Sequence, residues 1–366
     1  MSILDAVDTH FSATYQEARG KFLAACSSAE VRSIINPNLG PEGEELATDI
    51  AWFGPPDASR VFMMISSTHG VEGFCGSACQ LDWITEGGPA ALGPDTAVML
   101  VHAINPYGFA WIRRVTEEGC DLNRNYLDFS KPLPENPGHD ELVDAFVPAS
   151  LDAETLKLTE AKIAAWRAEH GEFAFQTARK AGQYKHAHSM FFGGFAPSWA
   201  RRTLESIIAD YELPARRMVT VVDYHTGLGS FGYGEPISGH LPDTLGLERI
   251  LKMYGHSVGV PESGTSASIP LHGTSRDVWD AMFNNTYTYV ALEFGTFSPE
   301  NGRLALRGDH WLHNQGEFDW NAPETRAIKA ALRLQYYPET PDWKEMVLWR
   351  SRQMQRQSLW GLETLA

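Results

Sequence analysis

Two residues of metal-ligand type stand three apart in His69-Gly-Val-Glu72, directly after the apolar run at 60–68. Imidazole nitrogen and carboxylate oxygen both bind zinc, and residues three apart at the opening of a helix can face one point. A catalytic zinc needs a third protein ligand and an open position for water. His225 is the candidate because it ends the Val-rich run at 216–225. Each signal also has a structural interpretation when it is taken alone. His69 and Glu72 can be a helix cap with a surface carboxylate, and His225 can be a core histidine.

An acidic residue, Glu293, lies near the end of another apolar segment, YVALEFGT. Burying an unpaired carboxylate is costly, so a carboxylate at such a position is usually paired or functional. A general base that exchanges protons with a water molecule is the functional interpretation. A structural ion pair is the alternative.

The segment at 105–126, NPYGFAWIRRVTEEGCDLNRNY, joins these residues into an ordered set. The order of an HxxE pair, an Asn-Pro-x-Gly-Phe turn, an arginine, an Asp-x-Asn-Arg-Asn run, a distant histidine and a late glutamate resembles the zinc carboxypeptidase family. The DLNR spelling also resembles the aspartoacylase and succinylglutamate desuccinylase branch. The whole run is similar to that of a bacterial group of carboxypeptidase-like proteins. The resemblance covers roughly 55–300.

The resemblance implies a role for each matching residue. One zinc ion per chain would be held by His69, Glu72 and His225, with Glu293 as general base. Asn123 and Arg124 would grip the terminal carboxylate of a substrate, and a guanidinium suits that task because it pairs with a carboxylate in a bidentate fashion. Arg113 or Arg114 would polarise the scissile carbonyl, and Asp121 would orient His69. Arg114 is favoured, but the spacing leaves either arginine open. Glu117 and Glu118 are the next candidates for the base.

The sequence departs from the family pattern in two places. The zinc carboxypeptidases carry a tyrosine some twenty residues before the base, and 262–276 contains none. Tyr287 and Tyr289 stand too close to Glu293 to replace it. No counterpart of the pocket that selects a side chain is readable. The substrate therefore stays open between a small peptide and an N-acyl amino acid, the latter as in the deacylase branch. A non-catalytic zinc-binding protein is the third interpretation, which an intact Glu293 disfavours.

The elements that must position these residues alternate along the chain. Strands are expected at 60–68, 97–104, 216–225 and 286–294, and helices at 5–27, 71–84, 151–181, 200–212, 323–336 and 342–360. Apolar strands that look buried on both faces predict an α/β fold, a mixed twisted sheet with helices on both faces, here of zinc carboxypeptidase-like type. In such sheets functional residues gather at the carboxyl ends of strands. We expect one catalytic domain over 1–366.

Within that domain we place the core at about 55–300, an insertion at about 130–215 and a helical C-terminal region at about 323–366. The insertion opens with a Pro-rich, irregular stretch at 130–150, and 182–199 is expected to be a loop rich in glycine and aromatic residues. His186 and His188 are expected in the exposed part of that loop, with the rim of the cleft as the alternative. Gly227, Gly229 and Gly232 spell GxGxxG, but the following residues cannot open the helix that a dinucleotide site needs.

Composition excludes several classes of protein. Of 366 residues, 43% are hydrophobic, which excludes a disordered chain, and the net charge of −16 comes without a basic patch, so nucleic acid is not an expected partner. No apolar stretch has the length of a membrane span, and the start of the chain reads as an amphipathic helix, so a cytoplasmic location is expected. Cys75 and Cys79 stand four apart and are expected as small buried hydrophobes.

Overall fold

The computed structural model describes residues 7–365. Within them, seven strands form one sheet in the order β1-β2-β4-β3-β5-β7-β6. Their bounds are β1 (Glu30–Leu39), β2 (Glu45–Phe53), β3 (Arg60–Ile65), β4 (Thr96–His102), β5 (Met218–Phe231), β6 (Gly234–Ser238) and β7 (Tyr287–Gly295). The central strands β4, β3, β5 and β7 are parallel, and the pairs β1–β2, β2–β4 and β6–β7 are antiparallel. The predicted mixed α/β sheet is confirmed.

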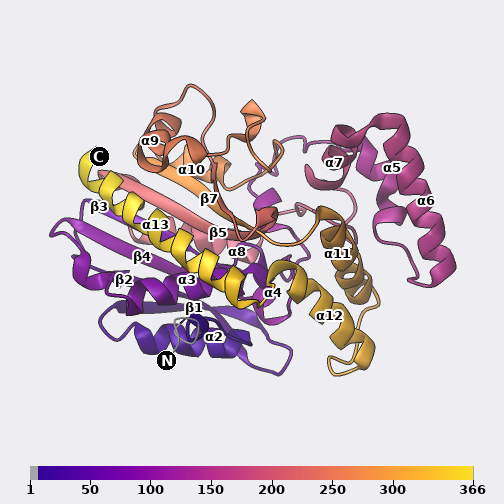
Figure 1. Cartoon of the computed structure of the whole chain (residues 1–366), viewed down its shortest axis with the longest axis horizontal. Coiled ribbons are helices and arrows are strands. Elements are labelled where there is room, and N and C mark those ends of the chain that lie inside the picture. The colour runs from indigo at the N-terminus through magenta and orange to yellow at the C-terminus, as the bar shows by residue number, and fades with distance from the viewer. Residues whose placement is uncertain (1–6, 366) are drawn as a thin grey trace.

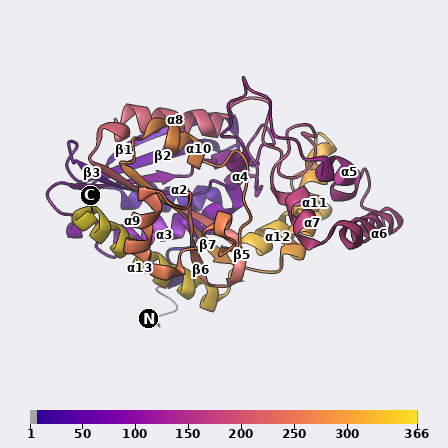
Figure 2. The ribbon, with the colours of Figure 1, turned by 90° about the horizontal axis from the view of Figure 1, so that it is seen from above.

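Helices cover both faces of this sheet because its central strands are apolar on both faces (Figure 1). Along β3, Phe62 and Met64 enter one core, whereas Val61, Met63 and Ile65 enter the other. The first core is closed by α2 (Tyr15–Ala25), α3 (Gly73–Thr85), α9 (Leu245–Tyr254) and α13 (Pro341–Leu365). The second is closed by α8 (Trp199–Asp210) and α10 (Arg276–Met282), which lie on the opposite side of the sheet in Figure 2.

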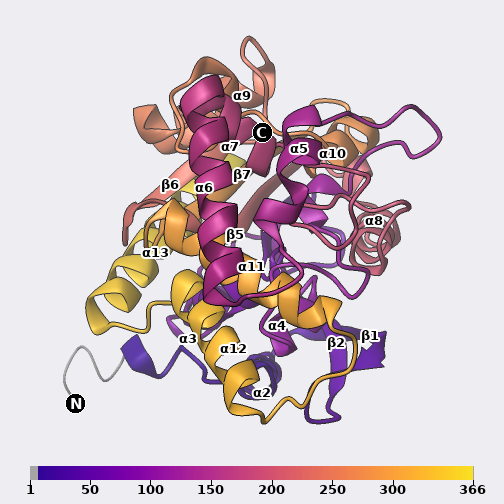
Figure 3. The same ribbon diagram turned by 90° about the vertical axis from the view of Figure 1, so that its right-hand side faces the viewer.

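Five further helices gather at one end of the sheet (Figure 1, Figure 3). They are α5 (Pro137–Phe146), α6 (Ala153–His170), α7 (Glu172–Lys180), α11 (Pro299–Asn314) and α12 (Pro323–Tyr336). The expected helix at 151–181 is divided at Gly171, whose φ of 85° suits glycine. The expectation that 130–150 is irregular is wrong where α5 stands. Helix α11 was not predicted.

The N-terminal part departs most from expectation. Of the helix predicted at 5–27, residues 5 and 6 lie outside the described residues. The helical conformation is interrupted before α2, which begins at Tyr15. The side chain of Thr14 accepts a hydrogen bond from the backbone N–H of Glu17, whose carboxylate accepts one from Ala13, so a reciprocal cap starts the helix here. Strands β1 and β2 were not predicted. β5 also continues beyond His225.

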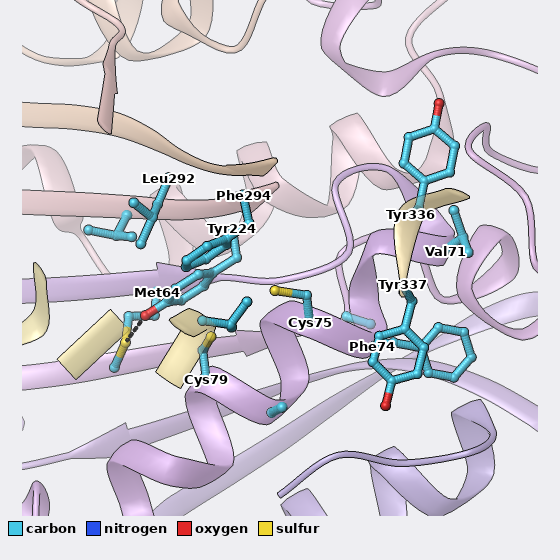
Figure 4. Close-up of a cluster of buried hydrophobic side chains, with 14 of the residues drawn as sticks. Met64, Val71, Phe74, Cys75, Cys79, Tyr224, Leu292, Phe294, Tyr336 and Tyr337 are labelled. Atoms are coloured by element: carbon cyan, nitrogen blue, oxygen red, sulfur yellow. Dashed lines mark hydrogen bonds between the residues drawn. The ribbon is translucent and has the colours of Figure 1, made fainter. Parts of the chain in front are cut away.

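The remaining composition-based expectations concern cysteines and membranes. All four cysteines are free and buried. Cys75 and Cys79 lie on α3 in an apolar cluster with Met64, Tyr224 and Leu292, as expected (Figure 4). In the part of the chain that the structure describes, no helix combines the length and the apolar character needed to cross a membrane.

Candidate active site

The three proposed ligand residues converge beyond the carboxyl end of β3, beside the middle of β5. His69 precedes the short 3-10 turn η1 (Gly70–Glu72), and His225 lies within β5. His69 Nδ1 is 3.1 Å from Glu72 Oε1 and 3.1 Å from His225 Nδ1, and His225 Nδ1 is 3.3 Å from Glu72 Oε2. A tetrahedral zinc with ligands at about 2.0–2.2 Å separates them by roughly 3.3–3.6 Å. The spacing and the donor set of two imidazoles and one carboxylate therefore fit zinc.

Two glycines dock the HGVE turn onto the Asn-Pro-Tyr-Gly-Phe segment. A Cβ on Gly70 would lie 2.2 Å from the carbonyl carbon of Gly108 and 2.2 Å from the carbonyl oxygen of Arg113. Asn105 caps the short helix α4 (Pro106–Ala110), since its side chain accepts a hydrogen bond from the Gly108 N–H at 2.9 Å. The backbone N–H of Val71 donates to the carbonyl of Arg113 at 2.8 Å. This close backbone packing carries the residue after Arg113 to the ligand cluster.

The two adjacent arginines point to different surroundings. Arg114 donates from Nη1 to Glu72 at 3.0 Å and from Nε to Asp121 at 2.9 Å, and it lines a cavity beside the ligand cluster. Arg113 is buried elsewhere, where its Nε donates to Asp309 at 2.9 Å and Lys329 completes the ion-pair cluster. Of the two arginines that the sequence left open, Arg114 is the one that faces the cavity.

Each proposed histidine ligand has a carboxylate beside its outer nitrogen. His69 Nε2 lies 3.2 Å from Asp121 Oδ1, the arrangement that the resemblance implied. Burial would raise the pKa of Asp121, but Arg114, Arg124 and His69 hold it well below its usual range. A carboxylate in this position fixes the orientation of a metal-binding imidazole.

The partner of the second histidine was not predicted. His225 Nε2 lies 3.0 Å from Asp223 Oδ2. Asp223 also accepts hydrogen bonds from the hydroxyl of Tyr289 at 2.8 Å and from Thr68 at 2.9 Å. Alternate residues of a strand share a face, so the spacing in Asp223-Tyr-His225 is a signal that could have identified this carboxylate.

Glu293 reaches the site from β7, where it is paired in register with His225 on β5. Its side chain is 7% exposed and its Oε1 accepts a hydrogen bond from the backbone N–H of Leu228 at 3.1 Å. Burial and the neighbouring Glu72 raise the pKa of Glu293 to about 8. A carboxyl group whose pKa lies near neutrality is suited to accepting and returning a proton.

The cavity next to these groups measures about 150 Å³ and is lined by His69, His225, Glu293, Arg114, Asn123 and Arg124, among others. Arg124 is almost fully buried, and three of its N–H groups bond to backbone: Nε and Nη2 to the carbonyl of Lys180, and Nη1 to that of Asn123. The ring of Phe191, from the predicted loop at 182–199, lies against both Arg114 and Arg124. The cavity thus brings the proposed carboxylate-binding pair to the ligand cluster.

A tyrosine that the sequence did not indicate also lines the cavity. Tyr289 lines the cavity too, but its hydroxyl donates to Asp223, and that of Tyr287 donates to Asp280. Tyr336 instead leaves the end of α12 in the opposite direction from Tyr337, which packs on Phe74 (Figure 4). Burial raises the pKa of Tyr336 to about 12 against the opposing effect of Arg114. The family pattern does not mark this residue, because the tyrosine of that pattern precedes the general base, whereas Tyr336 follows Glu293 in the chain.

The two histidines of the loop lie outside the cavity, whereas Gly227, the first glycine of the GxGxxG spelling, lines it. His186 pairs with Asp140 of α5 and His188 is exposed, and neither lines the cavity. The glycines of the GxGxxG spelling are followed by β6, so no helix opens there.

Solved structures similar to this chain come from the families that the motif order resembles. A carboxypeptidase A from Helicoverpa armigera is 14% identical with a TM-score of 0.44, covering 89% of this chain and 74% of its own. A metallo-carboxypeptidase from Burkholderia cenocepacia is 12% identical with a TM-score of 0.44, covering 95% and 69%. A succinylglutamate desuccinylase from Chromobacterium violaceum is 16% identical with a TM-score of 0.38, covering 87% and 74%.

Comparison with curated proteins gives no match. The family described as "Protein of unknown function (DUF2817)" matches residues 11–350, and the chain belongs to this family.

Proposed function

We propose that this chain is a zinc-dependent hydrolase that cleaves an amide bond next to a free carboxylate. The observation that carries the proposal is the convergence of His69, His225, Glu293 and two arginines on one cavity. A set of two histidines and one carboxylate leaves a fourth position open on a tetrahedral zinc, as catalytic sites require.

The residues divide the work of hydrolysis among them. Zinc, when bound, acts as a Lewis acid that lowers the pKa of a water molecule to about 7. Glu293 accepts a proton from the attacking water and delivers it to the departing nitrogen. Arg114 donates hydrogen bonds to the carbonyl oxygen as negative charge develops there. Asp121 and Asp223 hold the two imidazoles in orientation.

Binding of the substrate falls to the residues beyond the ligand cluster. Asn123 and Arg124 hold the free carboxylate through the N–H groups that the backbone carbonyls leave available. Because the ligand cluster and the carboxylate-binding pair line one cavity, the scissile bond lies close to the free carboxylate, as in a dipeptide or an N-acyl amino acid. Deacylation of N-acyl amino acids is therefore the second candidate. A non-catalytic zinc-binding role is disfavoured because it gives a buried Glu293 with a raised pKa no task.

A substrate panel tests the proposal. The zinc-loaded protein is assayed with dipeptides, N-acyl amino acids and the carboxamide of each compound, in which the free carboxylate is neutral. We expect cleavage of acids from one of the two classes, and cleavage of their carboxamides slowed by about 10- to 150-fold, the value of one charge-assisted pair. If no compound were cleaved at full zinc occupancy, the non-catalytic interpretation would replace the proposal. Equal rates for acids and carboxamides would remove the carboxylate role of Asn123 and Arg124.

A further inference from the structure

The cavity holds more positive charge than the proposed chemistry uses. Among residues 7–365, its lining includes the cations Arg114, Arg124, Arg179, Lys180, Arg276 and Arg303 but only the carboxylates Glu262 and Glu293. Arg276 pairs with Glu262, and Arg303 pairs with Glu300 and Glu160. Arg114 pairs with Glu72 and Asp121. Arg124, Arg179 and Lys180 remain without a close carboxylate, apart from a 3.9 Å contact between Arg124 and Asp121.

Arg179 and Lys180 are the unexplained members of this group. Arg179 is 3% exposed, and its two terminal nitrogens donate to neutral acceptors, the carbonyl of Pro299 and the side chain of Gln176, each at 3.0 Å. Its Nε is buried without a hydrogen-bond partner in the described chain. Lys180 is half-buried, and within residues 7–365 nothing accepts a hydrogen bond from its ammonium and no carboxylate lies within 4.0 Å of it.

Helix geometry alone does not account for this pair. Both residues end α7, and cations in a last turn favour the negative end of the helix dipole. That effect operates at the surface and needs no burial. Here burial lowers the pKa of Arg179 to about 10 and, together with Arg179 and Arg114, that of Lys180 to about 8. Glu300 and Glu172 attract Arg179, and Glu293 attracts Lys180, but none of these carboxylates lies within ion-pair distance. Buried charges are normally paired by direct contact, so this cavity-lining pair favours an anionic ligand.

We infer that Arg179 and Lys180 form a second oxyanion-binding subsite that takes a carboxylate in addition to the one held by Asn123 and Arg124. The carbonyl of Lys180 accepts two hydrogen bonds from Arg124, so the two subsites adjoin. The first carboxylate of the ligand pairs with Arg124. A second carboxylate on the same molecule pairs with Arg179 and Lys180. Resting on the proposed function, this inference names the substrate class as a short amide that carries two carboxylates.

Matched substrates and variants test the subsite in the zinc-loaded full-length protein. N-acetylglutamate is compared with N-acetylglutamine, and N-succinylalanine with its succinamide, because the second carboxylate can lie on either side of the scissile bond. For one of the two pairs we expect the wild type to prefer the dicarboxylate by about 10- to 100-fold in kcat/KM. In Lys180→Met this preference should disappear because KM for the dicarboxylate rises. Lys180→Arg, which keeps the charge, should retain it. Lys162→Met, an exposed change on α6, should leave it unaltered.

A binding measurement separates this inference from the proposed activity. Glutarate and butyrate are titrated calorimetrically into the same zinc-loaded proteins. Lys180→Met should lower the affinity for glutarate by about 10-fold or more and leave the affinity for butyrate nearly unchanged. If no amide is cleaved but glutarate behaves in this way, the hydrolase proposal fails and the subsite stands. Equal affinities of wild type and Lys180→Met for glutarate, or equal losses for both acids, would overturn the subsite. If Lys180→Met does not fold, the comparison is made with Lys180→Gln.

Discussion

Replacing Glu293 by Gln separates the proton chemistry of the site from its shape. Glutamine has nearly the same volume, and its carbonyl oxygen can still accept the hydrogen bond from Leu228 N–H at 3.1 Å. Glu293 is not one of the proposed ligands, so zinc should stay bound. The variant loses the group that accepts the proton of the water and returns it to the leaving nitrogen. General acid–base catalysis typically contributes about 10²- to 10⁴-fold, so turnover should fall by at least about 100-fold.

The assay combines three measurements on wild type and variant: zinc content, kcat on the best substrate of the panel, and affinity for a carboxylate inhibitor such as butyrate. We expect only kcat to change strongly, because Asn123 and Arg124 are untouched. Near-normal turnover with zinc bound would refute the assigned role. Glu117 and Glu118 could not then take it over, because they bond to Asn36 and to Thr116 and Trp199, and neither lines the cavity.

The raised pKa of Glu293 gives a second readout, in the metal-free protein. Burial and Glu72 raise this pKa to about 8, well above the value of about 4.5 in an unfolded chain. Between these values the folded state binds more protons than the unfolded state, so this group lowers the free energy of unfolding as the pH rises from about 4.5 to about 8. Glu293→Gln cannot titrate. Urea unfolding at pH 5 and pH 8 should therefore show a smaller loss of stability in the variant, and identical losses would contradict the pKa assignment.

Three further substitutions test the surroundings of the site. His225→Ala should lose most of the one zinc per chain that the three-ligand set predicts, measured by elemental analysis beside the exposed control His188→Ala; full occupancy would refute the ligand assignment. Asp223→Asn should weaken zinc about 10- to 100-fold in a chelator competition, with a smaller effect for Tyr289→Phe, and unchanged affinity would show that Asp223 does not orient His225. Asp309→Asn should lower the free energy of unfolding by about 3–5 kcal/mol in urea, because Arg113 and Lys329 lose their buried counterion. Burial would raise the pKa of Asp309, but Arg113 and Lys329 hold it well below its usual range. The stabilisation by ionised Asp309 is therefore present above about pH 4 and is lost as the pH falls below that value. In Asp309→Asn, this acid-dependent loss of the free energy of unfolding should be absent.

The positions that could be predicted from sequence are those set by local patterns. Apolar runs at 60–68 and 216–225 mark parallel strands, and the carboxyl ends of such strands meet at one edge of a sheet. His69 and His225 come together for that reason, although β5 continues beyond the histidine. Asp223 was within reach of the same logic, since it stands two residues before His225 on one strand.

Several elements were missed, although two of the missed helices carried signals at their first residues. Helices α5 and α11 begin with a polar cap followed by proline: the side chain of Asn136 accepts from His139 N–H, and that of Ser298 accepts from Asn301 N–H. β1 is an edge strand with mostly exposed residues, so it lacks the apolar run by which buried strands are identified.

The choice between Arg113 and Arg114 shows where local reasoning ends. The two residues are adjacent and identical in type, and their difference depends on partners that sequence cannot supply: Asp309 on α11 holds Arg113, and Glu72 with Asp121 holds Arg114. The same holds for the cavity wall, where α7 of the insertion brings Arg179 and Lys180, and α12 brings Tyr336. The groups proposed for chemistry thus follow strands whose ends are readable. The groups proposed to take a second carboxylate come from a helix placed by tertiary packing, and for that reason the reaction class is easier to derive from this sequence than the substrate.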